Sequence, residues 1–150
     1  MIQRKQSLFL LLAFIATVVC LCLPIAEIAP MGMGESIKLY NLCIVTSAGA
    51  NYSVCGLFGI LVMSAALSLG TIFLFNNRKL QSKFCVCNLF LLIAWYIVLG
   101  VTARNTSSVD FSFNIAFAAC LPAVAAILVF MARAGVIHDE KLVRAADRIR

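Results

Sequence analysis

Charged side chains are scarce in this sequence. Lysine, arginine, aspartate and glutamate make up 12% of its 150 residues, whereas 63% are hydrophobic, and the mean hydropathy is +1.04. Soluble domains usually have about 25% charged and about 45–50% apolar residues. The low charge therefore excludes an ordinary water-soluble domain, because the apolar excess is too large for one core. The length favours a single domain over residues 1–150, with its apolar surface in lipid.

The sequence also has few of the residues that catalysis and metal binding require. Its one histidine is His138, and the phosphate-binding pattern G-x-x-x-x-G-K is absent. Cys20/Cys22 form a C-x-C pair at the outer end of one apolar run, and Cys85/Cys87 form another at the inner end of a different run. The two pairs are therefore expected on opposite sides of the membrane and cannot share a zinc site. We therefore expect no enzyme activity, no cofactor and no metal. The basic residues flank the apolar runs, which is typical of membrane orientation signals and argues against nucleic-acid binding.

Four apolar stretches are long enough to cross a bilayer as helices, which takes about 20 residues. They cover residues 8–28, 54–75, 84–103 and 113–132, and the one charged residue among them is Glu27. The first stretch is too long for a typical signal-peptide core, and the nearest cleavage site places Glu27 where a small residue is required. The sequence predicts an all-α membrane protein with four transmembrane helices.

Two segments outside these stretches have patterns of their own. Residues 37–45 are rich in β-forming side chains but too short to span, so we expect a short strand or hairpin in the first outer loop. Gly135 follows the last apolar run and indicates a helix end. Residues 136–150 then predict a separate cytoplasmic tail with an amphipathic helix from Asp139. Its apolar positions form a candidate partner surface: Leu142, Ala146 and Ile149.

The basic residues predict the orientation in the membrane. With four spans, both termini and the 76–83 connector share one side, which carries ten of the twelve lysines and arginines. Because basic residues accumulate on the cytoplasmic side, both termini are expected inside, and the polar lead 3–6 should touch the charged tail. A basic collar on this side either binds anionic lipid headgroups or serves only to fix the topology: Arg4, Lys5, Arg78, Lys79, Lys83 and Arg133.

Cys43 and Cys55 are expected on the opposite side of the membrane, where an oxidising compartment permits a disulfide. Such a bridge would hold the β-forming segment against the start of the second span. Free cysteines are also common in apolar segments, so both interpretations remain open.

Both ends of the chain resemble a known family. Residues 1–13, MIQRKQSLFLLLA, and residues 139–150, DEKLVRAADRIR, are similar to the opening and the close of an uncharacterised family of short bacterial membrane proteins. It is a domain-of-unknown-function family of the Bacteroidetes type, and Tyr40-Asn41-Leu42 is a third similarity. The resemblance implies a four-helix protein of the bacterial inner membrane. It implies no activity and no catalytic residue.

Three functional hypotheses follow. The first is a non-enzymatic accessory, scaffold or lipid-contacting component of the inner membrane, whose partners are the bilayer and either another membrane protein or a second copy. The second is a small oligomeric transporter or channel, although such proteins usually carry ionisable groups within their spans. The third is a membrane-embedded thiol-redox protein that uses Cys43 or Cys55. Polar residues within the spans, among them Ser64, Ser68 and Asn88, predict hydrogen bonds between helices.

A reporter protein fused after Arg150 tests the orientation. We expect cytoplasmic activity of the reporter, because the basic residues near the spans keep this end inside. The matched control is the same reporter inserted after Gly34 in the first long connection, which should report the opposite side. An extracytoplasmic reporter at Arg150 would contradict the orientation.

Overall fold

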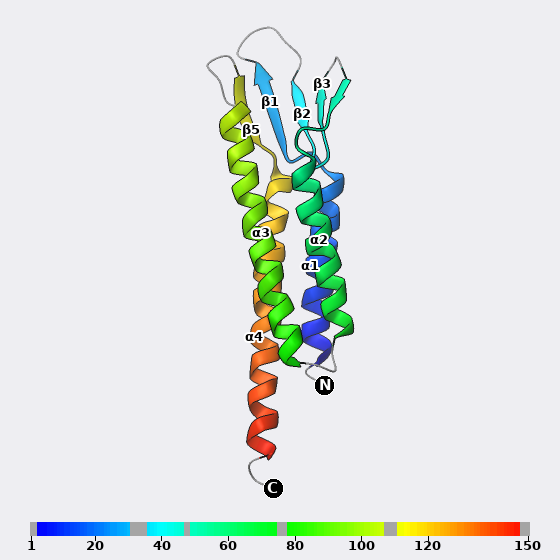
Figure 1. The fold of residues 1–150 in the computed structure, drawn as a ribbon, viewed down its shortest axis with the longest axis vertical. Helices are drawn as coiled ribbons and strands as arrows, with labels where there is room; N and C mark the ends of the chain where they lie inside the picture. The colour runs from blue at the N-terminus through cyan, green and yellow to red at the C-terminus, as the bar shows by residue number, and fades with distance from the viewer. Residues whose placement is uncertain (1–2, 31–35, 47–48, 75–77, 107–110, 148–150) are drawn as a thin grey trace.

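The computed structural model describes residues 3–30, 36–46, 49–74, 78–106 and 111–147. Within them the chain is mostly helical, with a small sheet at one end of the helices (Figure 1). The elements in chain order are α1 (Gln3–Cys22), β1 (Ala26–Pro30), β2 (Ile37–Leu39), β3 (Ile44–Thr46), β4 (Gly49–Asn51), α2 (Cys55–Phe73), α3 (Arg78–Thr106), β5 (Phe111–Ile115), the 3-10 helix η1 (Phe117–Cys120) and α4 (Leu121–Asp147).

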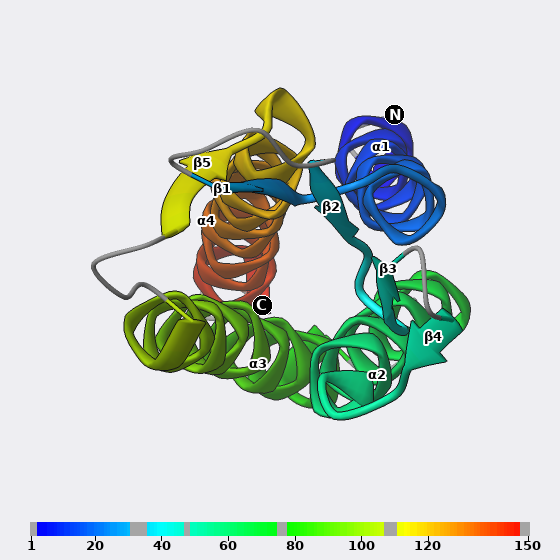
Figure 2. The same cartoon turned by 90° about the horizontal axis from the view of Figure 1, so that it is seen from above.

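The four helices form an up-and-down bundle. Viewed from the sheet end they lie in a ring, in which α1 packs against α2 and α4, and α3 packs against the same two helices (Figure 2). On α1, the inward positions include Gln6 and Thr17, whereas Leu8, Leu12 and Ile15 are exposed. The outer surface of the bundle is therefore as apolar as its interior, which is the arrangement that a lipid environment favours.

In the part of the chain that the structure describes, three helices are long and apolar enough to cross a membrane: Cys55–Phe73, Leu80–Thr106 and Phe117–Glu140. The apolar part of α1 within the described residues, Gln6–Cys22, is shorter. The helices predicted at residues 54–75 and 84–103 are thus confirmed as apolar helices of spanning length.

The predicted first span, 8–28, is wrong at its outer end, because α1 ends at Cys22 and β1 begins at Ala26. Pro24 lies in between and has no backbone N–H to continue a helix. Ala26 and Ile28 are buried in the sheet, and Ile25 just before it is buried as well, so the hydropathy of this segment does not distinguish a strand from the end of a spanning helix.

The predicted fourth span, 113–132, is wrong at both ends. Residues 113–115 belong to β5, and α4 runs without interruption from Leu121 to Asp147, so residues 136–147 are not a separate helix. Pro122 is the second residue of α4, where its missing N–H costs no helical hydrogen bond. Gly135 lies inside α4, where an added Cβ would come 3.0 Å from Cγ of Gln6. A close helix contact, and not a helix end, explains this glycine.

The strands form one antiparallel sheet in the order β4-β3-β2-β1-β5, which is more than the predicted hairpin and makes the all-α assignment too narrow. β1 and β5 come from opposite ends of the sequence, and Ala26 pairs with Ile115. One face of the sheet buries Ala26, Ile28 and Leu39 in the core. The other face exposes one row of residues, one from each strand: Asn114, Glu27, Lys38, Val45 and Ala50.

Asn41 joins the sheet to the bundle. It follows β2, and its side chain is fully buried between α1 and α3. Its amide Nδ2 donates to the Cys20 carbonyl at 2.7 Å, and its Oδ1 accepts a hydrogen bond from Nε1 of Trp95 at 3.0 Å. Trp95 is the largest fully buried side chain of the described residues. One asparagine therefore satisfies the indole N–H of α3 and a carbonyl in the last turn of α1.

Replacing Asn41 by alanine should destabilise the fold by about 1–3 kcal/mol, because two buried polar groups lose their partner. The measurement is reversible unfolding in mixed detergent and lipid micelles. Asn114→Ala is the matched control, since Asn114 is exposed on the sheet and its loss should cost less than about 0.5 kcal/mol. Equal stability of the two variants would contradict the role given to Asn41.

Candidate functional site

The most distinctive feature of the bundle is a set of buried polar side chains between the helices. Between the middle of α2 and the first half of α3, Ser64 Oγ donates to Asn88 Oδ1 at 2.5 Å, and Asn88 Nδ2 donates to Ser68 Oγ at 2.7 Å. Ser68 Oγ in turn donates to the Ser64 carbonyl at 3.0 Å. All three side chains are at most 1% exposed. The predicted interhelical hydrogen bonds are confirmed here, and these groups saturate one another.

A second buried contact joins the two ends of the chain. Gln6 Nε2 on α1 donates to Asp139 Oδ2 on α4 at 2.5 Å, and the two residues are 6% and 7% exposed. This confirms the prediction that the N-terminal polar lead touches the charged tail. Gln6 also packs over Gly135, which lets α1 and α4 approach closely.

Sequence analysis did not predict that several individual polar side chains would be buried. Gln6, Asn41, Gln81 and Asp139 are buried and polar, and Gln81 Nε2 donates to the Thr71 carbonyl at 3.4 Å. A signal for Gln6 exists in the spacing of the buried residues of α1, because it precedes Leu10, Ala13 and Thr17 by four, seven and eleven residues. Asn114 was expected inside a span, but it is exposed on β5.

The basic collar is brought to one end of the bundle, where α1 and α3 begin (Figure 1). Lys83 is exposed on α3, and Arg133 is half-buried on α4. The Nε atom of Arg133 is enclosed and has no hydrogen-bond partner. The side chains of Arg4, Lys5, Arg78 and Lys79 lie outside the described part of the structure. Whether the collar binds headgroups or only fixes topology stays a prediction.

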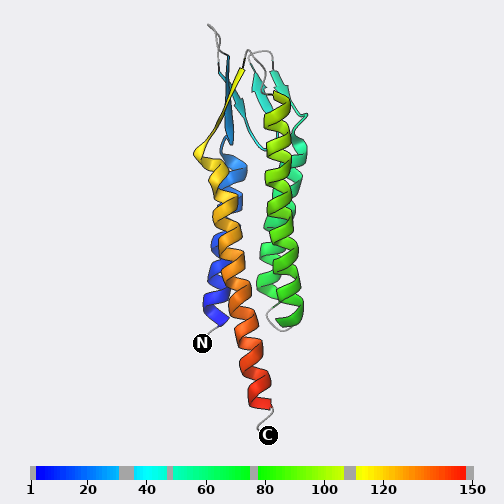
Figure 3. The same ribbon diagram turned by 90° about the vertical axis from the view of Figure 1, so that its left-hand side faces the viewer.

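The predicted partner surface lies where α4 continues beyond the ends of the other helices (Figure 3). Leu142 is 50% exposed, and its neighbour Val143 is 45% exposed. The side chain of Ala146 and the whole of Ile149 are outside the described residues. The part that is described therefore presents two large apolar side chains at the tip of a rigid helix.

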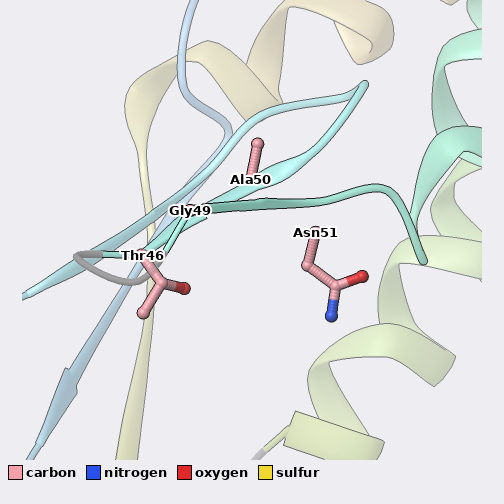
Figure 4. A pocket seen from close by; sticks show the side chains of 4 residues that line it. All are labelled: Thr46, Gly49, Ala50 and Asn51. Carbon is pink, nitrogen blue, oxygen red and sulfur yellow. The ribbon is translucent and has the colours of Figure 1, made fainter.

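The remaining candidates offer less chemistry. Cys43 is half-buried and Cys55 is exposed, and each is a free thiol in the structure, so a bridge between them stays a prediction. Among the described residues no cluster of three or more histidine, cysteine or acidic side chains has the geometry to hold a metal. A shallow hollow of about 290 Å³ lies at the β3–β4 hairpin, without a charged side chain in its lining: Thr46, Gly49, Ala50 and Asn51 (Figure 4).

The bundle, its apolar outer surface and its three helices of spanning length define a small helical protein of the membrane type. The chain belongs to the family described as a domain of unknown function, DUF4293, whose model matches residues 2–149. This confirms the resemblance to an uncharacterised family over nearly the whole chain. No curated protein matches the chain.

A double-mutant cycle on Gln6 and Asp139 measures the contact between the two ends of the chain. We expect Gln6→Ala and Asp139→Ala to be non-additive, with a coupling of about 1–2 kcal/mol in unfolding free energy, because each removes the same buried bond. The control cycle pairs Gln6→Ala with Asn88→Ala, which share no partner and should add within about 0.5 kcal/mol. Additive effects at Gln6 and Asp139 would contradict the contact.

Proposed function

We propose that this chain is a non-enzymatic scaffold or accessory protein of the bacterial inner membrane, with four spans and both termini in the cytoplasm. The sheet then stands outside, and the tip of α4 reaches into the cytoplasm. The bilayer is its first partner, and another membrane protein is the second. Ten of the twelve basic residues on the side of the termini support this orientation.

The proposal adds α1 to the three helices of spanning length as a further transmembrane helix. Its apolar part, Gln6–Cys22, would reach about 26 Å at 1.5 Å per residue, close to the roughly 30 Å of a hydrocarbon core. Its outward face carries only apolar large side chains between Leu8 and Val19, and its inward face packs against α2 and α4. A helix with this surface would be poorly placed in water.

The observation that carries the scaffold role is the mutual pairing of the buried polar groups. Asn88 is hydrogen-bonded to two serines, and Asp139 is hydrogen-bonded to Gln6. Asn41 is hydrogen-bonded to Trp95 and to a backbone carbonyl. A transport path or a catalytic site needs polar groups that water or substrate reaches. Groups that already satisfy one another, among leucine and alanine side chains, favour a stiff bundle that holds its two ends in fixed positions.

Those two ends supply the surfaces for a partner. On one side, the sheet presents its row of exposed residues, which includes Glu27 and Lys38 as direct cross-strand neighbours. On the other side, Leu142 and Val143 are exposed at the tip of α4. Because this tip lies beyond the spanning part of α4, lipid does not cover it, and a protein partner on the cytoplasmic side fits its apolar character.

The double substitution Leu142→Glu and Val143→Glu tests the scaffold role while leaving Asp139 and its bond to Gln6 in place. We expect proteins cross-linked to the chain in native membranes to fall about tenfold, because charge at an apolar contact is costly. Tyr52→Glu is the matched control, since Tyr52 is 60% exposed after β4, at the other end of the molecule and outside the exposed row of the sheet. Retention of the same partners by the double variant would contradict this role for α4.

A further inference from the structure

We propose that Arg133 binds the phosphate group of an anionic membrane phospholipid, in a site between α3 and α4 at the end of the bundle where the chain begins. The proposal requires that α3 and α4 lie in the membrane. It depends neither on which side of the membrane this end faces nor on the scaffold role, because phospholipids are present in both leaflets.

The first observation is an unsatisfied donor. Nε of Arg133 is enclosed by protein and finds no hydrogen-bond acceptor among the described residues. A buried polar group without a partner costs free energy, and in native proteins such groups commonly indicate an ion or ligand that completes them. By contrast, the buried amides of Gln6, Asn88 and Asn41 each make a hydrogen bond to a neighbouring element.

The second observation is how firmly the arginine is placed. On α4 it follows Ala132 and lies one turn before Val136, both fully or almost fully buried. Across the helix contact it lies near Cys85, which is 1% exposed on α3. The arginine is therefore half-buried beside the contact of α4 with α3, with its Nε enclosed and part of its side chain exposed.

The third observation is what surrounds the open edge. Phe130, three residues before Arg133 and therefore beside it on the same face of α4, is 59% exposed, so the surface next to Arg133 is apolar and suits lipid chains. Arg133 lies seven residues before Glu140, the end of the apolar part of α4, which is about 10 Å along the helix. A long arginine side chain at this depth reaches the level of the phospholipid phosphates.

Phosphate fits the chemistry of this site. The planar guanidinium donates in pairs to phosphate oxygens, and Nε is one of the donors in that fork. Lys83, exposed near the same end of α3, adds positive charge that favours an anionic over a zwitterionic lipid. The apolar surroundings favour a phosphate that brings its own acyl chains over a free, hydrated phosphate ion.

Native mass spectrometry of the purified full-length chain tests the site directly. The protein is supplied with equal amounts of phosphatidylglycerol and phosphatidylcholine, and the lipids it retains are counted. We expect the chain to retain phosphatidylglycerol preferentially and Arg133→Leu to weaken that retention about tenfold, as loss of a charge-assisted hydrogen bond predicts. Arg104→Leu, which removes an exposed arginine from the other end of α3, should behave as the unchanged chain.

Two further measurements keep the outcome clear. Arg133→Lys keeps the positive charge but loses the planar pair of N–H donors, and we expect it to retain an intermediate amount of phosphatidylglycerol. Millimolar inorganic phosphate should not displace the lipid. Undiminished retention by Arg133→Leu would overturn the site, and displacement by inorganic phosphate would overturn its assignment to a lipid. If Arg133→Leu does not fold, equal thermal stability of the unchanged chain in phosphatidylglycerol and phosphatidylcholine nanodiscs would overturn the proposal.

Discussion

The buried face of α1 carries Gln6 and Thr17, while its exposed face carries leucine, isoleucine and valine. Apolar burial alone does not determine which face of such a helix turns inward, because lipid is as apolar as the protein interior. The hydrogen bonds between helices make that choice. Gln6 with Asp139 fixes α1 against α4, and Asn88 with Ser64 and Ser68 fixes α2 against α3. The register of the whole bundle depends on these few polar contacts.

The same principle extends to the sheet. Asn41 carries a loop side chain into the end of the bundle, where Trp95 and the Cys20 carbonyl each need a partner. The Ile25 backbone makes the same connection, because its N–H donates to the Leu39 carbonyl and its carbonyl accepts from the Ala116 N–H. The sheet and the helices therefore contribute to one hydrophobic core.

The sequence was sufficient to predict the membrane class, the helices around residues 54–75 and 84–103, the meeting of the two ends and the family. It was insufficient at Ala26, Ile28 and Phe113, where buried strands are as apolar as a spanning helix and hydropathy cannot separate them. The helix end predicted at Gly135 was wrong, because a single sequence does not distinguish a glycine at a close helix contact from a glycine at a helix end. Asn41 and Arg133 acquire meaning only from neighbours on other elements, which no local pattern contains.

The pairing of β1 with β5 has a consequence for biosynthesis. Pro30 of β1 pairs with Phe111 of β5, so β1, the strand next to the β5 edge, is synthesised long before β5. At about 5–20 residues per second, roughly 4–16 seconds separate the two strands on the ribosome. During that time β1 has β2 on one side and an open edge on the other, and both α2 and α3 are synthesised before the edge closes. The last strand to arrive thus completes a sheet begun by the first, and a chain interrupted before residue 111 would leave that edge exposed.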